Sequence, residues 1–99
     1  MLQPQVTIEY SNGKVYVGEI EVTNFKRHGK GVLTFMNGDR FDGHWIDDNK
    51  HGHGQDISQG GKRILEGVWK EGRISGEASM TDEDSVEYQV ELKIREIQK

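Results

Sequence analysis

The 99-residue chain lacks cysteine and contains a single proline. Without cysteine it can form neither disulfides nor cysteine-based zinc or nucleophile sites, which is compatible with the cytosol. Hydrophobic residues make up only 32% of the chain, so a globule with a thick core is not expected. No apolar run approaches the length of a membrane span, and the first ten residues, MLQPQVTIEY, lack the apolar core of a signal peptide.

An excess of basic charge is also missing. The chain has 13 Lys and Arg against 17 Asp and Glu, a formal net charge of −4. Proteins that bind nucleic acid non-specifically carry clustered Lys and Arg on a basic domain. We therefore do not expect nucleic acid as a partner.

Glycine, in contrast, is abundant, with 13 copies that are typical of many tight turns. The segment 28–45 (HGKGVLTFMNGDRFDGHW) predicts one β-hairpin, because Leu33 and Phe35 alternate with small or polar residues before the Asn37-Gly38 pair. Asn-Gly favours a type I′ turn, which needs positive φ at both central residues. We expect that turn here.

Three short elements of this hairpin recur along the chain every 23 to 25 residues. They are an aromatic residue two before a glycine, a Gly-x-Gly element, and a turn that ends in glycine. Their copies are Tyr16-Val17-Gly18, Phe41-Asp42-Gly43, Leu65-Glu66-Gly67 and, weakly, Tyr88-Gln89-Val90; Gly29-Lys30-Gly31, Gly52-His53-Gly54 and Gly76-Glu77-Ala78; and Asn12-Gly13, Asn37-Gly38 and Gly60-Gly61. A fixed period in the twenties indicates a repeat architecture, with repeats at about 10–34, 35–57 and 58–81.

Glycine occupies the middle of the repeated strand face, between two bulky residues. A glycine weakens a strand unless something approaches its backbone closely. We expect rings of adjacent strands to lie across these glycines, with Leu33 and Phe35 covering Gly43. The glycines expected to have structural roles are Gly18, Gly29, Gly31, Gly43, Gly52, Gly54, Gly67 and Gly76.

The segment 86–95 alternates strictly between apolar and polar residues. A helical stripe is the alternative, but it leaves two apolar residues off the stripe, so we predict a strand. This strand either caps the repeats or docks on a partner by strand addition. Its apolar face comprises Val86, Tyr88, Val90, Leu92 and Ile94.

All connections between the predicted strands are short, so neighbouring strands must be antiparallel. The chain is therefore predicted to be one all-β domain over residues 1–99. Its fold is a single-layer, open antiparallel meander of about eight strands, built from β-hairpin repeats.

The pattern aromatic-x-Gly-x-Trp, a turn, His-Gly-x-Gly and an Asn-Gly turn resembles the MORN (membrane occupation and recognition nexus) repeat. The resemblance covers residues 10–80 in about three copies, with the central copy closest. Departures are Ile20 for the Trp, Leu65 for the aromatic, Ala78 for the second Gly and a two-residue insertion before Gly29. The resemblance implies an elongated sheet with a groove that serves as a scaffold for protein or lipid contacts, without catalysis. By family alone, a ciliary or cytoskeletal assembly in the cytoplasm is expected.

Catalytic and metal sites are not expected. His51 and His53 stand two apart, but no motif supplies a third ligand, and His28 and His51 share one repeat position that favours a structural role in a turn. The acidic pair 47–48 and run 82–84 lack the pattern of a calcium loop. The Gly-x-Gly elements precede no helix, so they are not phosphate cradles. We predict no enzyme and no cofactor.

Two binding hypotheses remain. In the favoured one, a protein partner, or a second copy of the chain, lies in an aromatic groove lined by Tyr16, Leu33, Phe35, Phe41, Trp45 and Trp69. In the other, a basic turn with one exposed ring contacts anionic lipid. That turn comprises Phe25, Lys26, Arg27 and Lys30.

Overall fold

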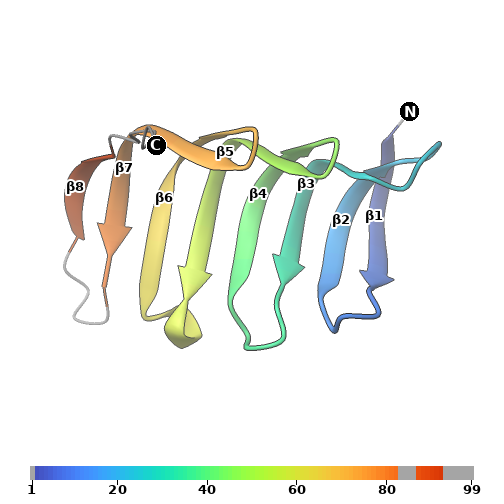
Figure 1. Ribbon diagram of the computed structural model, residues 1–99, viewed down its shortest axis with the longest axis horizontal. Helices are drawn as coiled ribbons and strands as arrows, with labels where there is room; N and C mark the ends of the chain where they lie inside the picture. The colour runs from blue at the N-terminus through green and yellow to red at the C-terminus, as the bar shows by residue number, and fades with distance from the viewer. Residues whose placement is uncertain (1, 83–86, 93–99) are drawn as a thin grey trace, which may run out of the picture.

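A computed structural model describes the backbone of residues 2–82 and 87–92 and the side chains of residues 5–58 and 60–82. One sheet contains eight strands, hydrogen-bonded in the order β1 to β8, and every pair is antiparallel (Figure 1). The predicted open meander is thereby confirmed. The strands are β1 (Leu2–Glu9), β2 (Val15–Glu21), β3 (Arg27–Thr34), β4 (Arg40–Ile46), β5 (Asn49–Ser58), β6 (Arg63–Lys70), β7 (Arg73–Thr81) and β8 (Glu87–Leu92).

The turns at the two ends of the sheet are of different kinds. The prediction of a type I′ turn at Asn37-Gly38 is wrong, because only Gly38 of that pair has positive φ (+93°). The Phe35 carbonyl accepts from the Gly38 N–H (2.9 Å), and the Phe35 N–H donates to the Asp39 carbonyl (2.8 Å). This is a three-residue hairpin loop in which one residue, the glycine, takes the left-handed conformation.

At the opposite end of the sheet, the β4–β5 turn has positive φ at both central residues, Asp47 (+46°) and Asp48 (+71°). Ile46 and Asn49 pair directly across this two-residue turn. Positive φ at both central residues is the mark of the I′ conformation. The I′ geometry therefore occurs where the sequence shows two aspartates rather than Asn-Gly.

Each Gly-x-Gly element lies where a strand bulges. Between the pairs Gly43–Gly54 and Trp45–Lys50, β5 uses two more residues than β4. The first glycine of the element, Gly52, sits in this bulge with φ of +75°. Bulges bend a strand and increase its twist. The strand segments beyond the bulges run across the top of the view in Figure 1 rather than along the sheet.

The second glycine of each element belongs to a row that crosses the sheet. The row consists of directly paired residues on successive strands: Val6, Gly18, Gly31, Gly43, Gly54, Gly67, Ala78 and Val90. A Cβ on Gly43 would lie 2.6 Å from the Gly54 Cα and 2.8 Å from the His53 carbonyl oxygen. The backbones of paired strands thus approach too closely at Gly18 and Gly43 for a side chain.

Aromatic rings cover the row, but not the rings we expected. Leu33 and Phe35 do not cover Gly43. Instead a Cβ on Gly54 would meet the Phe41 ring, and a Cβ on Gly31 would meet the Tyr16 ring. Each ring therefore lies over the glycine of the following strand, within its own repeat.

The rings form a continuous edge-to-face series along the bent sheet. The ring centroids are 5.8 Å apart for Tyr16 and Trp45, 5.3 Å for Phe41 and Trp45, and 5.1 Å for Phe41 and Trp69, with interplanar angles of 83–90°. Perpendicular pairs at this distance are favoured by the ring quadrupoles. This series is the centre of the core, and no second layer covers the sheet within residues 2–82 and 87–92.

Backbone carbonyls of the glycine row satisfy the two indoles. The Trp45 Nε1–H donates to the Gly31 carbonyl (3.0 Å), and the Trp69 Nε1–H donates to the Gly54 carbonyl (3.1 Å). The two bonds are equivalent in successive repeats. They orient each Trp across the neighbouring strands.

The last described strand lies at an edge of the sheet. β8 pairs with β7, and Ala78 lies opposite Val90. This confirms a strand rather than a helix over residues 87–92, while Val86 and Ile94 lie outside the described residues. The described helical structure is a three-residue 3₁₀ turn, η1 (Gln59–Gly61), and no described helix is long and apolar enough to cross a membrane.

Candidate functional site: a groove on the concave face

The aromatic floor that the sequence suggested is not open. Five of its six residues are buried, and the exposed fraction of their side chains is 5% or less: Tyr16, Leu33, Phe41, Trp45 and Trp69. They are buried because the strands bend over them and the rings cover one another. Only Phe35 of the predicted set remains partly exposed. The expectation of an accessible aromatic row is therefore corrected.

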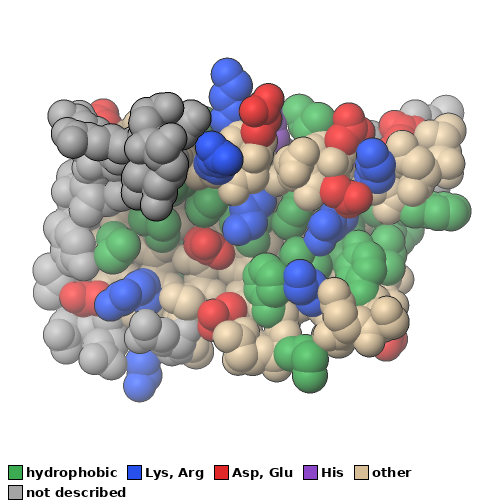
Figure 2. Space-filling model, viewed as in Figure 1, with side chains coloured by type: hydrophobic (Ala, Val, Ile, Leu, Met, Phe, Trp, Pro, Cys, Tyr) green, Lys and Arg blue, Asp and Glu red, His purple; other side chains and the backbone are tan. Residues whose placement is uncertain are grey.

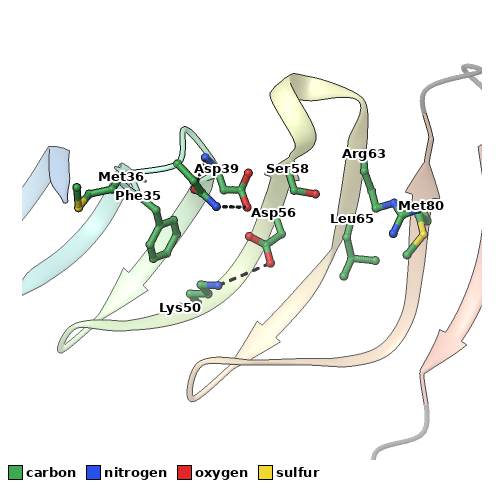
Figure 3. Close-up of a pocket in the computed structure, with 10 residues that line it drawn as sticks. Phe35, Met36, Asp39, Lys50, Asp56, Ser58, Arg63, Leu65 and Met80 are labelled. Carbon is green, nitrogen blue, oxygen red and sulfur yellow. Dashed lines mark hydrogen bonds and ion pairs between the residues drawn. The ribbon is translucent and has the colours of Figure 1, made fainter. Parts of the chain in front are cut away.

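A groove does exist on the same face, displaced toward the third repeat (Figures 2 and 3). We call it the lower groove, and its volume is about 590 Å³. Figure 2 shows hydrophobic side chains interspersed with charged ones across this face. The lower groove is lined by Phe35, Met36, Asn37, Asp39, Lys50, Asp56, Ser58, Arg63, Leu65 and Met80.

The departures of the third repeat from the motif explain why the groove lies there. Phe41, Asp56, Leu65 and Met80 are paired in turn on four successive strands. Phe41 is fully buried, whereas Leu65 and Met80 are partly exposed. No aromatic ring stands at position 65 to lie over the next strand. An apolar hollow remains instead.

Lys50 forms one wall of the lower groove. Its ammonium lies 4.7 Å from the ring centroids of both Phe41 and Trp69 and 3.9 Å from an Asp56 carboxylate oxygen. Cations over aromatic faces are attracted by the ring quadrupole. Lys50 therefore shields the two rings from solvent while its charge is balanced at the edge of the groove (Figure 3).

Arg27 takes the same part in the first repeat. Its guanidinium lies 4.8 Å from the Trp45 ring centroid and 5.6 Å from that of Tyr10, and it pairs with Asp48 at 3.0 Å. The equivalent residue of the third repeat is Ile74, which is buried. The cation that shields the rings in two repeats is therefore replaced by an apolar side chain in the third.

These contacts divide the predicted lipid-binding set. Phe25 (67% exposed) and Lys26 stand at the tip of the β2–β3 connection. Arg27 turns onto the aromatic series, and Lys30 borders a second hollow of about 470 Å³. That hollow is lined by Gln5, Val17, Glu19, Lys30, Gly31, Val32 and Asp42. The four residues do not form one basic cluster.

Two polar side chains, one buried and one at a turn, have structural partners. The Tyr16 hydroxyl donates to the Glu19 carbonyl at 2.6 Å, and burial raises the pKa of Tyr16 to about 12. His28 Nδ1 accepts from the Asp47 N–H at 3.3 Å, as a turn-structural role requires.

Among the described residues no group of three His, Cys, Asp or Glu side chains could hold a metal ion.

The sequence reasoning missed most of the lower groove. Met80 and Arg63 belong to no repeated motif, Met36 only begins a repeated turn, and Lys50 and Asp56 resemble ordinary surface charges in the sequence. The available signal was the substitution of Leu65 for an aromatic. Leu65 departs from the family pattern, and the same departure removes the ring that would fill the hollow.

Comparison with known proteins identifies the family of this chain. The "Inactive protein tyrosine kinase pTKL" of Plasmodium berghei (strain Anka) is 34% identical over 70 residues, which are 71% of this chain and 5% of that protein. The chain thus spans about one-twentieth of the length of this relative. MORN repeats generally mediate protein or membrane interactions rather than catalysis. The MORN repeat family model matches residues 26–40, 41–55 and 66–85, so the chain belongs to the MORN repeat family.

Proposed function

We propose that this chain is a non-enzymatic interaction module that binds an apolar segment of a partner protein in the lower groove, as part of a larger assembly. One observation carries the proposal. Phe35, Leu65 and Met80 remain partly exposed and Met36 is 80% exposed, and all four line the lower groove on a face where the rings of the aromatic series are buried. Apolar patches bordered by charge commonly mark interaction sites.

The side chains of the groove suit an adaptable contact. Met36 and Met80 are unbranched and polarizable, so they can adjust to the shape of a bound side chain. Leu65 and Phe35 supply more rigid apolar surface. A strand or an amphipathic helix of a partner would place alternate or helically spaced apolar residues along such a surface.

The proposal is tested by placing a charge in the groove. Met36→Glu and Met80→Glu should abolish recovery of the partner in affinity purification followed by mass spectrometry. Val68→Glu is the matched control, because Val68 is 42% exposed and its strand position faces away from the groove. Circular dichroism must show the fold retained in all three variants. Equal recovery by the groove and control variants would refute binding in the groove.

Contact with anionic lipid is a second candidate, carried by the exposed Phe25 beside Lys26 at a hairpin tip. A ring that enters the interface next to a cation is a usual membrane anchor. The expected result is flotation with phosphatidylserine-containing liposomes at low salt, which Phe25→Ala and Lys26→Glu together abolish. If the parent chain does not float, this candidate is excluded.

A further inference from the structure

The charges of the lower groove are not equally balanced. Lys50 is paired with Asp56, and the Asp39 carboxylate accepts from the Asn37 amide at 3.3 Å. Arg63 is exposed and forms no ion pair within the part of the chain that the structure describes. Its side chain lies beside Leu65 and Met80 at the β6–β7 end of the groove (Figure 3). Arg63 can therefore pair with a ligand, and it lies next to the apolar hollow formed by Leu65 and Met80.

We propose that the segment bound in the lower groove carries an acidic residue next to its apolar anchor, and that this acid pairs with Arg63. The inference rests on the proposed function of the groove. An arginine fork can take a carboxylate through two parallel hydrogen bonds, which fixes direction as well as adding affinity. The apolar anchor then lies over Leu65 and Met80.

The groove also selects the direction of the segment. Asp39 lies at the end of the groove near Phe35, away from Arg63 (Figure 3). An acidic residue at that end would meet the Asp39 carboxylate, whereas beside Leu65 it meets Arg63. Asp82, which follows β7 at the same end as Arg63, already has an interaction partner. The net charge of −4 opposes an acidic ligand only weakly at this range, because charges beyond about 8–10 Å are screened at physiological salt.

A basic residue is the less favourable alternative. Asp56 already holds Lys50, and the faces of Phe41 and Trp69 are already occupied by the same ammonium. A basic side chain of a partner would have to displace Lys50 to gain the same contacts. Beside Leu65 and Met80, the groove therefore offers a basic residue little net gain.

Three short synthetic peptides test the inference. They share alternating Leu and Met residues and differ in one residue, Glu, Gln or Arg, next to the terminal apolar side chain. Fluorescence anisotropy with the full chain measures their affinities. The Glu peptide should bind about two- to five-fold more tightly than the Gln peptide, as an exposed ion pair provides. Raising the salt concentration should remove the difference.

Variants of the chain locate the pair. Arg63→Gln should abolish the preference for Glu, and Arg63→Glu should make the Arg peptide the tightest of the three. Arg40→Gln is the matched control. Arg40 is exposed, and because it directly precedes Phe41 in β4, its side chain lies on the face of the sheet opposite the groove. It should leave the preference unchanged.

The possible failures differ. Equal affinity for the Glu and Gln peptides, with loss of both on Met80→Glu, would overturn the acidic preference and leave the groove as a binding site. Absence of binding by all three peptides would overturn both proposals. Sedimentation of the parent and of Arg63→Gln tests a second copy as the occupant. A dimer that dissociates in the variant would also overturn the proposal of a separate partner.

Discussion

Lys50 and Asp56 lie on the same strand, six residues apart, yet their charged groups approach to 3.9 Å. A straight strand would separate their Cα atoms by about 20 Å, which the lysine side chain cannot span. β5 must therefore turn back between them, and it does so at the bulge that contains Gly52. This bend lets a single-layer sheet bury aromatic rings.

Lys50 should stabilise the bend through its charge. Lys50→Met keeps an apolar stem over Phe41 and Trp69 but loses the cation–π contacts and the pair with Asp56. We expect a loss of about 1–2 kcal/mol in the free energy of unfolding, measured with urea. Lys26→Met, at an exposed tip, should change it by no more than about 0.5 kcal/mol. A Lys50→Met variant as stable as the parent would show that the charge of Lys50 does not contribute to stability.

The Phe41 ring fills the space that a Cβ on Gly54 would need. A smaller residue at position 41 should therefore compensate for a larger one at position 54. Gly54→Ala places a methyl group against the Phe41 ring and should cost about 1–3 kcal/mol, as for an overpacked core. The third repeat carries Leu65 and Ala78 at the equivalent positions. Phe41→Leu combined with Gly54→Ala should therefore be more stable than the sum of the single changes predicts.

A double-mutant cycle in urea measures this coupling, which should be about 1 kcal/mol or more in the favourable direction. Gly67→Ala is the control within the same glycine row. The nearest atom to its Cβ is Ile74 Cδ1 at 3.0 Å, the end of a side chain that can move. Its cost should be smaller than that of Gly54→Ala. If the effects of Phe41→Leu and Gly54→Ala are additive, the packing of the Phe41 ring does not require the absence of a Cβ at position 54.

Stability should fall at high pH through Tyr16. Its pKa is about 12 in the folded chain and about 10 when unfolded, so the unfolded state loses its proton first. The free energy of unfolding should therefore be unaffected by this group below pH 10 and decrease as the pH rises to 12. Tyr16→Phe should remove this decrease, although it also loses the hydrogen bond to Glu19. A similarly steep decrease in both proteins would assign it to another group.

The two tryptophans should behave as buried fluorophores. Trp45 is 3% and Trp69 is 5% exposed, so their emission should be blue-shifted and poorly quenched by iodide until the chain unfolds. Ligands of the lower groove should leave this quenching nearly unchanged, because they contact Leu65 and Met80 instead. Strong quenching in the folded chain would show instead that the tryptophans are accessible, as in the open aromatic groove expected from the sequence.

Much of the fold follows from local rules that the sequence displays. Period-two alternation identified the strands, short connections required antiparallel neighbours, and the repeated glycines indicated a MORN-like meander. The strand over 87–92 was also predicted correctly, because strict alternation leaves a helix without a continuous apolar stripe. These features depend on residues close together in the chain.

The site depended on contacts between residues far apart. The sequence shows that Tyr16 and Phe41 share a face, but only the bend of the strands decides that they are buried. Arg27 resembles a surface charge in a basic turn until the bend places it over Trp45. The sequence by itself determined the strands, their order and the row of glycines, since these follow from local periodicity and short turns. The tertiary structure decided which face is covered and where a groove remains, because burial depends on how the strands curve around their own rings.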